Sequence, residues 1–535
     1  MTPQVWLCSI LLIVFFAVMI GVGFYTRSHA TDVNGFVLGG RSVGPWLTAF
    51  AFGTSYFSAV IFVGYAGQFG WKFGLASTWA GLGNAFIGSL LAWNILGRRT
   101  RIMTQKLDAK TMPDFFGKRF ASDKLKVIAS VIVFIFLIPY TASLYNGLSS
   151  LFGLVFDLPY WVVILVMAVL TGVYVIFGGY MATAINDFIQ GIIMLFGISA
   201  VIYSVIANNG GLVEATKKLS VIPTEGWEGG AFSSFLGPDP LALLFVVILT
   251  SLGTWGLPQM VGKFYAIKSE KDIHKGTVIS TVFAIIVAGG CYFLGGFGRL
   301  YADKIKYATK IVDGNEVQTP LFDTIVPAML STLPSVIIAV VIVLVLSASM
   351  STLSSLVLTS SSTFTLDVIK PALKKDMSEK SQVTTMRAFI VFFIAISAII
   401  AIVKDANPQV TFIAQMMGVS WGALAGAFLA PFLYGLYWKR ATKLACSVCF
   451  AWGCAIAVIQ MIITLNGVDV TSWGKVLGYI FSSSINSGVV AMVGGLVIVP
   501  VISVLSKTQN DPKKIDAMFE AFEEKVSVPK KEALD

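Results

Sequence analysis

The 535-residue sequence has few of the side chains that enzymes use for acid–base or metal chemistry. It contains two histidines and five cysteines, and 12% of its residues are charged. His29 and His274 fall in expected loops, so neither is available for a buried Ser/His dyad or a pair of haem ligands inside the membrane. Every Gly-Lys pair is followed by Arg, Phe or Val, which excludes the Gly-Lys-Ser/Thr of a phosphate-binding loop. We therefore expect no enzymatic activity.

The cysteines do not form a recognisable metal or disulfide pattern. Cys446 and Cys449 are spaced as C-x-x-C, but Cys454 is the only other cysteine nearby and no histidine or acid accompanies them. Cys8 and Cys291 stand alone in apolar runs. This spacing predicts packing within a membrane helix and no disulfide framework.

Apolar residues, in contrast, are abundant. The sequence is 56% hydrophobic with a mean hydropathy of +0.82, well beyond what the core of a water-soluble domain needs. A helix crosses a bilayer with about 20 apolar residues, and we expect an all-α polytopic membrane protein with about 13 transmembrane helices. The expected spans are roughly residues 6–26, 45–68, 75–97, 126–156, 159–179, 182–206, 241–262, 276–298, 333–364, 386–404, 410–437, 441–464 and 486–506.

The distribution of charge predicts the orientation. If the N-terminus is outside, most of the 38 Lys and Arg residues fall in loops on the inner side. We therefore expect an integral protein of the plasma (cytoplasmic) membrane with its C-terminus inside. The net charge of +10 then reflects topology and attraction to the lipid bilayer, so no nucleic-acid partner is implied. No obligate protein partner is evident.

A run of hydroxyl side chains, LSASMSTLSS at residues 346–355, interrupts an apolar span. On a helix that turns about 100° per residue, Ala348, Ser351, Thr352 and Ser355 share one stripe, and Ser354 lies nearby. Clustered neutral oxygens suit a hard monovalent cation. The alternative is that each hydroxyl bonds to the backbone carbonyl one turn earlier in the same helix.

One acid lies well inside an expected span. Asp187, in GGYMATAINDFIQG, follows the start of the sixth span by about a turn and a half, where it is expected to face the protein interior. The alternative is an acid near the interface that the helix dipole favours.

Two expected spans contain helix-breaking residues. The second carries Gly53 within AFAFGTSYFSAV, and the seventh carries Gly253, Gly256 and Pro258 within SLGTWGLPQM. If the first span is set aside, these are the first and sixth of the next ten, which are corresponding positions of two five-helix halves. Matched interruptions of this kind indicate an inverted-repeat transporter with its site at the midplane, although glycine also serves simple helix packing.

At the level of whole motifs, the chain resembles the sodium:solute symporter family. The likeness rests on GGRSVGPWLTAFAFGTSYFSA, TMPDFFGKRF, FGGYMATAINDFIQG, SMSTLSSLVLTSSSTFTLD and GLYWKRATKLA, which occur in this order. The resemblance implies the leucine-transporter-type fold, a five-plus-five inverted repeat with three peripheral helices. It also implies coupling of sodium influx to uptake of a small organic solute.

The resemblance further implies roles for particular residues. One sodium ion would be bound by the carbonyls of Thr54, Phe57 and Ala348 and by the hydroxyls of Ser351 and Thr352. A second would be bound by Asp187, Ser351, Ser354 and Ser355, so two co-transported ions are expected. The solute-facing positions implied are Tyr56, Ser58, Tyr140, Trp255, Gln259 and Gln415.

Departures from known members bear on the solute. Tyr56 stands where proline-transporting members have an Asp, and Val60 and Thr250 replace two Trp residues associated with proline. The fourth span has no Arg after Lys126 to bind a carboxylate as members that carry sialic acid do. We expect a carboxylate or vitamin such as a monocarboxylate or pantothenate. The alternatives are a proline-type amino acid, a proton-coupled carrier, or a ligand sensor that does not transport.

The expected organisation follows the repeat. Residues 1–30 form a peripheral first helix, and residues 45–437 form the transport core, with repeat one at 45–206 and repeat two at 241–437. Residues 441–506 supply two more peripheral helices. Residues 507–535 form a cytoplasmic tail whose mixed charge predicts little structure.

Overall fold

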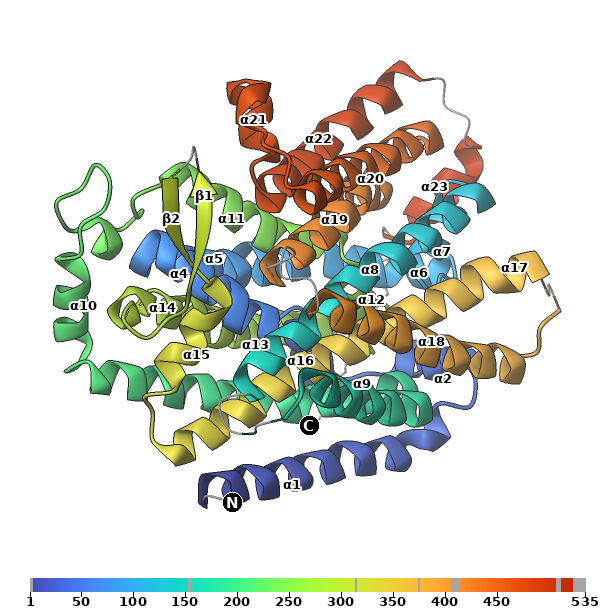
Figure 1. The fold of residues 1–535 in the computed structure, drawn as a ribbon. Helices are drawn as coiled ribbons and strands as arrows, with labels where there is room; N and C mark the ends of the chain where they lie inside the picture. The colour runs from blue at the N-terminus through green and yellow to red at the C-terminus, as the bar shows by residue number, and fades with distance from the viewer. Residues whose placement is uncertain are drawn as a thin grey trace, which may run out of the picture.

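The structure is a computed structural model that describes residues 3–152, 156, 158–312, 315–373, 376–405, 413–506 and 511–522. Within these residues the chain is almost entirely helical, with one two-stranded antiparallel sheet (Figure 1). The helices of the apolar body are α1 (Pro3–Tyr25), α3 (Pro45–Thr54), α4 (Ala66–Phe73), α5 (Thr78–Gly83), α8 (Asp123–Phe152), α9 (Tyr160–Asn208), α11 (Pro240–Leu252), α12 (Pro258–Ala266), α13 (Glu270–Ala284), α14 (Gly290–Gly295), α16 (Ser335–Phe364), α18 (Glu379–Asp405), α19 (Ile413–Tyr437), α20 (Lys443–Asn466) and α22 (Ser484–Leu505).

Shorter elements lie at the two ends of this body. They are α2 (Val33–Leu38), α6 (Arg98–Lys106), α7 (Met112–Arg119), α10 (Leu212–Ser220), α15 (Ile325–Leu330), α17 (Lys370–Leu373), α21 (Lys475–Phe481), α23 (Pro512–Glu520), β1 (Tyr307–Val312) and β2 (Asn315–Pro320). β1 and β2 form a hairpin whose register pairs Tyr307 with Pro320. Side chains that cap helix N-termini mark where several helices begin: Thr111, Asp239, Ser269, Thr442 and Ser483.

The number of spans differs from the 13 expected. By length and composition, the described residues contain 10 helices that could cross a membrane, or 11 if the bent pair α11 and α12 counts as one span. The 49-residue α9 contains a kink at Gly179, where φ is 55°. A straight helix of that length would be about twice as long as the bilayer is thick. The count of 13 therefore remains a prediction.

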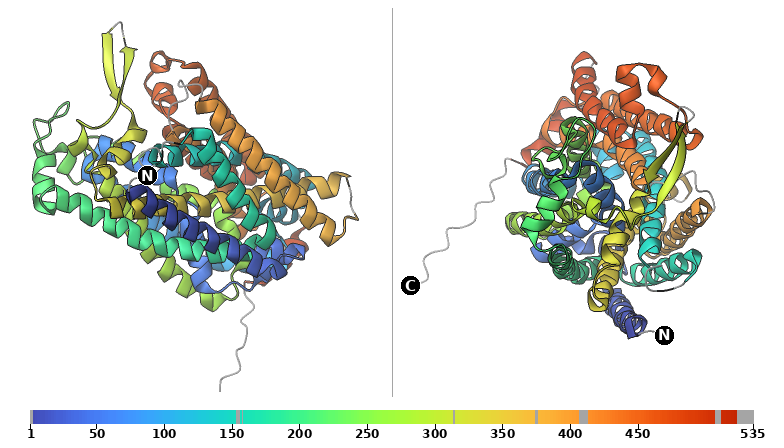
Figure 2. Two further views of the ribbon diagram at one scale, coloured as in Figure 1. Left: turned by 60° about the horizontal axis from the view of Figure 1, so that its bottom comes forward. Right: turned by 60° about the vertical axis from the view of Figure 1, so that its left-hand side comes forward.

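The first and last long helices lie on opposite sides of the body. α1 runs along the outside of α9, whereas α20 and α22 pack with α19 on the far side (Figures 1 and 2). Their outward faces carry large apolar side chains such as Ile13 and Val501. These exposed surfaces, together with the apolar spans, fit an integral membrane protein.

Different short elements lie at the two ends of the body. α10 and the hairpin lie at one end, and α6, α7, α17 and α23 lie at the other (Figure 1).

Part of the C-terminal segment is ordered, because Ile515 and Phe519 of α23 are buried and α23 packs against α6. The expectation of little structure is therefore wrong for Pro512–Glu520. That expectation rested on the mixed charge of the segment, which did not reveal the apolar face of α23. Residues 507–510 and 523–535 lie outside the described part.

Candidate ion and solute site

The first helix break lies where α3 ends at Thr54. Residues 55–58 are not helical, and the chain re-enters a helical segment, η3 (Val60–Tyr65), shortly afterwards. Gly53 allows this segment to approach α13, since a Cβ there would lie 2.4 Å from a ring carbon of Phe283. The break leaves the carbonyl oxygens of Thr54 and Phe57 available to another helix.

Five oxygens from the break and from α16 come together at this point. The Thr352 hydroxyl lies 3.0 Å from the Thr54 carbonyl oxygen, 3.2 Å from that of Phe57 and 3.1 Å from that of Ala348. The Ser351 hydroxyl lies 3.2 Å from the Thr54 oxygen and 3.1 Å from the Ala348 oxygen. All five residues are buried. We call Thr54, Phe57, Ala348, Ser351 and Thr352 the five-oxygen cluster.

The hydroxyls of the run differ in whether they reach beyond their own helix. Ser351 and Thr352 bond to Ala348 in their own helix and also reach across to the break. Ser354 donates to the Ser351 carbonyl oxygen of its own helix at 2.9 Å. Hydroxyls that reach a second helix can serve a ligand shared between the helices, whereas a hydroxyl that bonds back to its own helix satisfies itself.

Asp187 lies close to this cluster with a partner that the sequence interpretation missed. Its side chain is fully buried in α9, and Oδ2 lies 3.7 Å from the Lys263 ammonium nitrogen of α12. Lys263 also donates to the Ser355 hydroxyl at 3.0 Å. Lys263 falls one residue beyond the expected seventh span, which ends at residue 262. The available signal was the four-residue spacing from Gln259, which puts both side chains on one helical face.

The second break brings α12 to the same place. Gly253–Gly256 forms a 3-10 turn, Leu257 is extended, and Pro258 starts α12. At Gly256 a Cβ would lie 2.7 Å from the Ala425 backbone, so only glycine permits this contact with α19. α12 then packs against both α3 and α16. The two interrupted segments therefore meet beside one another, as the sequence predicted.

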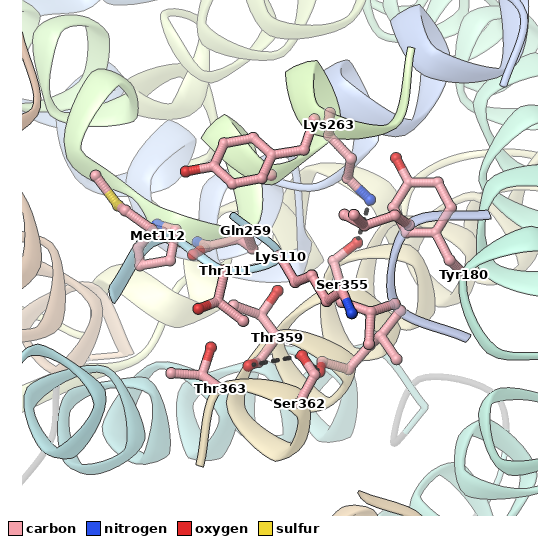
Figure 3. A pocket seen from close by; sticks show the side chains of 16 residues that line it. Lys110, Thr111, Met112, Tyr180, Gln259, Lys263, Ser355, Thr359, Ser362 and Thr363 are labelled. Atoms are coloured by element: carbon pink, nitrogen blue, oxygen red, sulfur yellow. Dashed lines mark hydrogen bonds between the residues drawn. The ribbon is translucent and has the colours of Figure 1, made fainter. Parts of the chain in front are cut away.

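A small cavity adjoins these groups (Figure 3). It measures about 50 Å³, and its lining includes Gln259, Lys263, Ser355 and Thr359. This volume admits a few water molecules. Both polar atoms of the Gln259 side chain are buried without a hydrogen-bond partner in the protein.

The structure does not place all six expected solute residues in one cavity. Tyr140 donates to the Tyr56 carbonyl oxygen at 3.4 Å, and both residues and Ser58 are buried. Trp255 donates instead to the Ile87 carbonyl oxygen at 3.0 Å. Gln415 lines a different, apolar cavity of about 540 Å³ together with Pro139, Val419 and neighbouring residues.

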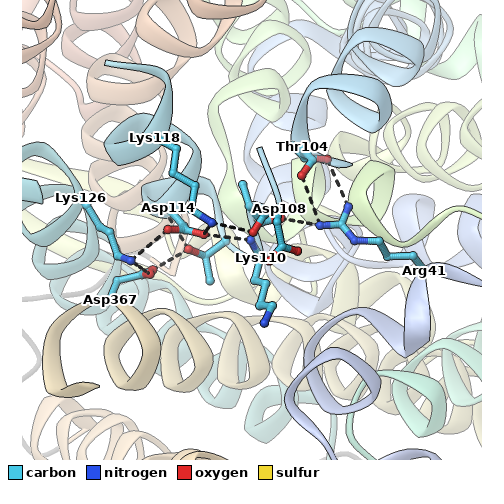
Figure 4. A network of polar contacts seen from close by, with 10 residues as sticks. Arg41, Thr104, Asp108, Lys110, Asp114, Lys118, Lys126 and Asp367 are labelled. Carbon is cyan, nitrogen blue, oxygen red and sulfur yellow. Dashed lines mark hydrogen bonds and ion pairs between the residues drawn. The ribbon is translucent and has the colours of Figure 1, made fainter. Parts of the chain in front are cut away.

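A charged network lies beyond the small cavity, toward the end formed by α7 (Figure 4). Asp114 pairs with Lys126 at 2.9 Å and with Lys118 at 3.0 Å, and Lys126 also lies 3.3 Å from Asp367. Burial acts to raise the pKa of Asp114, but the two lysines outweigh burial and hold that pKa below its ordinary value. Thr111 donates to Asp367 and lines the cavity, so the network borders it.

No cluster suited to a transition metal accompanies this site. Among the described residues, no group of three or more His, Cys, Asp or Glu side chains comes together. The described cysteines are free, and Cys449 packs in the core beside Ala445. Neutral oxygens therefore dominate the cluster at the first break.

Comparison with known proteins identifies the family. The sodium:solute symporter family matches residues 36–447. The chain belongs to this family. The osmoregulated proline transporter OpuE of Bacillus subtilis (strain 168) is 29% identical to this symporter over 451 residues, which cover 83% of this chain and 85% of the relative. The sodium/proline symporter of Staphylococcus aureus (strain JH9) is 29% identical over 460 residues, 82% of each chain.

A solved structure supports the fold. A substrate-bound, outward-open Na⁺-coupled sialic acid symporter matches with a TM-score of 0.72 at 17% identity, covering 94% of this chain and 99% of that chain. The architecture is thus that of the leucine-transporter-type carriers. The protein is a sodium-coupled solute symporter and not an enzyme, and sodium is its co-transported ion. This favours sodium symport over the proton-coupled and sensor alternatives.

Proposed function

We propose that the five-oxygen cluster binds the sodium ion that drives transport. The observation that carries the proposal is the convergence of three carbonyl and two hydroxyl oxygens from α3, the break and α16, with contacts between 3.0 and 3.2 Å. Hard oxygens of this number suit a hard cation, and an uncharged set suits a monovalent one. On ion binding, the two hydroxyls rotate their protons away and present lone pairs.

The ion would couple two parts of the protein. Thr54 and Phe57 belong to the broken first segment, whereas Ala348, Ser351 and Thr352 belong to α16. A cation bound between them stabilises the arrangement in which they are close. In broken-helix carriers, movement of one repeat against the other then exposes the site to one side or the other. We propose residues 45–437 as this core, since α1, α20 and α22 lie outside it.

The proposed solute is a small organic molecule with a carboxylate, of the monocarboxylate or pantothenate type. Tyr56 at the first break, in place of an acid, supports a solute without a strongly basic group next to this position. A carboxylate can be bound by hydroxyls and by the N-terminal ends of broken helices. Proline is the second candidate, and it is favoured by the names of the relatives in B. subtilis and S. aureus.

We assign solute contact first to Tyr56, Ser58 and Tyr140, and then to Gln259. Tyr56 and Tyr140 are hydrogen-bonded across the break, and Gln259 has an unsatisfied buried amide at the small cavity. A ligand would repay the burial of such an amide. Trp255 and Gln415 are weaker candidates, because Trp255 is bonded to Ile87 and Gln415 lines the apolar cavity.

The proposed orientation puts the α6 and α7 end in the cytoplasm. α6 alone contributes Arg98, Arg99 and Arg101, and α7 contributes Lys118 and Arg119. Positive residues of this density are typical of the inner side. The N-terminus of α1 would then lie outside.

Uptake into proteoliposomes tests the function. Labelled proline, pantothenate and pyruvate are offered separately, with an inward gradient of sodium or of potassium. We expect one solute to accumulate only with sodium. Ser351→Ala should abolish this sodium-driven accumulation. Ser361→Ala should preserve it, since the Ser361 hydroxyl bonds to the Leu358 carbonyl oxygen within α16. Equal uptake in both salts would contradict the proposal, and the preferred solute separates the two candidates.

A further inference from the structure

We propose that the Lys263 ammonium group takes the place of a second sodium ion, so that this protein carries one sodium per solute. The inference rests on the proposed function of the five-oxygen cluster and goes beyond it, because it replaces the expected two-ion stoichiometry. It starts from the residues that the resemblance assigned to the second ion: Asp187, Ser351, Ser354 and Ser355.

Two of these four residues already contact a cation of the protein itself. The Lys263 nitrogen lies 3.7 Å from Asp187 Oδ2. It also donates to the Ser355 hydroxyl at 3.0 Å (Figure 3). An ammonium group is a compact single positive charge with three donors. It therefore supplies to the carboxylate and the hydroxyl what a sodium ion would supply.

The other two residues are engaged elsewhere. Ser354 donates to the Ser351 carbonyl oxygen, and the Ser351 hydroxyl belongs to the five-oxygen cluster. A sodium ion between Asp187 and Ser355 would also lie within a few ångströms of the ammonium nitrogen. Like charges that close repel strongly in a site with little water. The lysine and a second sodium ion are thus mutually exclusive.

The surrounding structure fixes Lys263 in this position. The side chain extends from the last turn of α12, the helix that follows the second break, and is 4% exposed. Its nitrogen also lies 5.2 Å from the centre of the Tyr180 ring, which follows the kink at Gly179. A buried lysine and a buried aspartate are each costly alone, whereas together they carry no net charge, and the Tyr180 ring adds a favourable contact to the ammonium group. These contacts hold the Lys263 side chain beside Asp187 and Ser355.

The substitution has a measurable consequence for accumulation. With a membrane potential of about 100 mV and a tenfold sodium gradient, one sodium ion supports accumulation of a neutral solute on the order of 10²- to 10³-fold. Two ions would support on the order of 10⁵-fold under the same gradients. A protein that uses Lys263 in place of a second sodium ion therefore reaches a lower solute accumulation ratio, but it consumes one sodium ion fewer for each solute molecule.

Counting bound ²²Na⁺ on the purified full-length protein in nanodiscs tests the proposal. We expect one saturable ²²Na⁺ per wild-type chain and one per Lys263→Arg chain, because arginine keeps the cation. We expect two per Lys263→Met chain and one per chain of the Asp187→Asn, Lys263→Met double variant. A wild-type count of two, with one lost in Asp187→Asn, would overturn the proposal. So would a folded Lys263→Met protein that binds only one ion.

The same experiment separates this proposal from the function on which it rests. A wild-type count of zero, or a count unaffected by Ser351→Ala, contradicts the five-oxygen cluster itself. If Lys263→Met does not fold, the ratio of charge to solute moved by the wild type in proteoliposomes decides. For a neutral solute, a ratio of one supports the proposal and a ratio of two overturns it. For a monocarboxylate anion, whose own charge cancels that of one sodium ion, the corresponding ratios are zero and one.

Discussion

Two polar clusters lie about one turn apart on α16, and they satisfy their charge in different ways. The five-oxygen cluster contains only neutral carbonyls and hydroxyls, drawn from α3, the break and α16. The Asp187, Lys263 and Ser355 cluster carries one charge of each sign, drawn from α9, α12 and α16. The first offers lone pairs to a cation from outside. The second already contains its cation.

The contrast shows why a count of buried oxygens does not give a count of ions. Ser351 and Ser355 are both buried hydroxyls of one helix, and their spacing along the sequence treats them alike. Their neighbours differ, because Ser351 faces the Thr54 carbonyl and Ser355 faces an ammonium group. The local electrostatic environment decides which of the two positions can take sodium.

Removing an oxygen from the neutral cluster should have the largest effect on transport. Thr352→Val keeps the side-chain shape and deletes a hydroxyl that contacts three carbonyl oxygens. We expect sodium affinity to fall at least about tenfold and uptake to fall with it. Thr277→Val is the matched control, since the Thr277 hydroxyl is buried but bonds to Ile273 within its own helix. Sodium titrations of uptake measure both; equal losses would contradict the assignment.

Breaking the charged cluster should instead affect stability. In sodium-free buffer, Asp187→Asn and Lys263→Met each leave one buried charge without its partner, which costs about 3–5 kcal/mol. The double variant removes both charges and should recover much of that loss. The surface pair Arg98–Glu270, at 2.7 Å but nearly half exposed, is the comparison, with an expected coupling below about 1 kcal/mol. Double-mutant cycles of unfolding in nanodiscs measure both coupling energies. Similar values for the two pairs would contradict the claim that the buried pair is the more strongly coupled.

The sequence predicted the neutral cluster better than the charged one. Hydroxyls recurring at helical spacing on α16 and glycines at the two breaks are local patterns, and the structure brings these segments together. Lys263 was missed because its burial depends on α12 beginning at Pro258 and continuing to Ala266, beyond the expected end of the span. Asp367 was missed similarly, since the helix continues past Phe364 and buries it. Span ends depend on packing that hydropathy does not encode.

The second break provides a smaller test of how the clusters are positioned. A Cβ on Gly256 would lie 2.7 Å from the Ala425 backbone, so Gly256→Ala should displace α12 and cost about 3 kcal/mol. Gly253→Ala in the same break is the control, because its Cβ would meet the Trp421 ring at an ordinary 3.4 Å. Thermal unfolding compares the two variants. Similar midpoints would show that α12 can shift without loss.

The smallest expected effect concerns the charged network at the α7 end. The lowered pKa of Asp114 means that its ionised form stabilises the folded state above its unfolded pKa of about 3.9, and that this contribution is lost as pH falls through the lower folded value. Asp114→Asn should therefore cost about 1 kcal/mol at pH 8, because both lysines remain partly hydrated. Unfolding midpoints of the variant and the wild type at this pH provide the measurement, and a loss as large as that of Asp187→Asn would contradict the assignment. A small penalty would distinguish this solvent-bordered network from the enclosed Asp187–Lys263 pair, whose loss costs several times more.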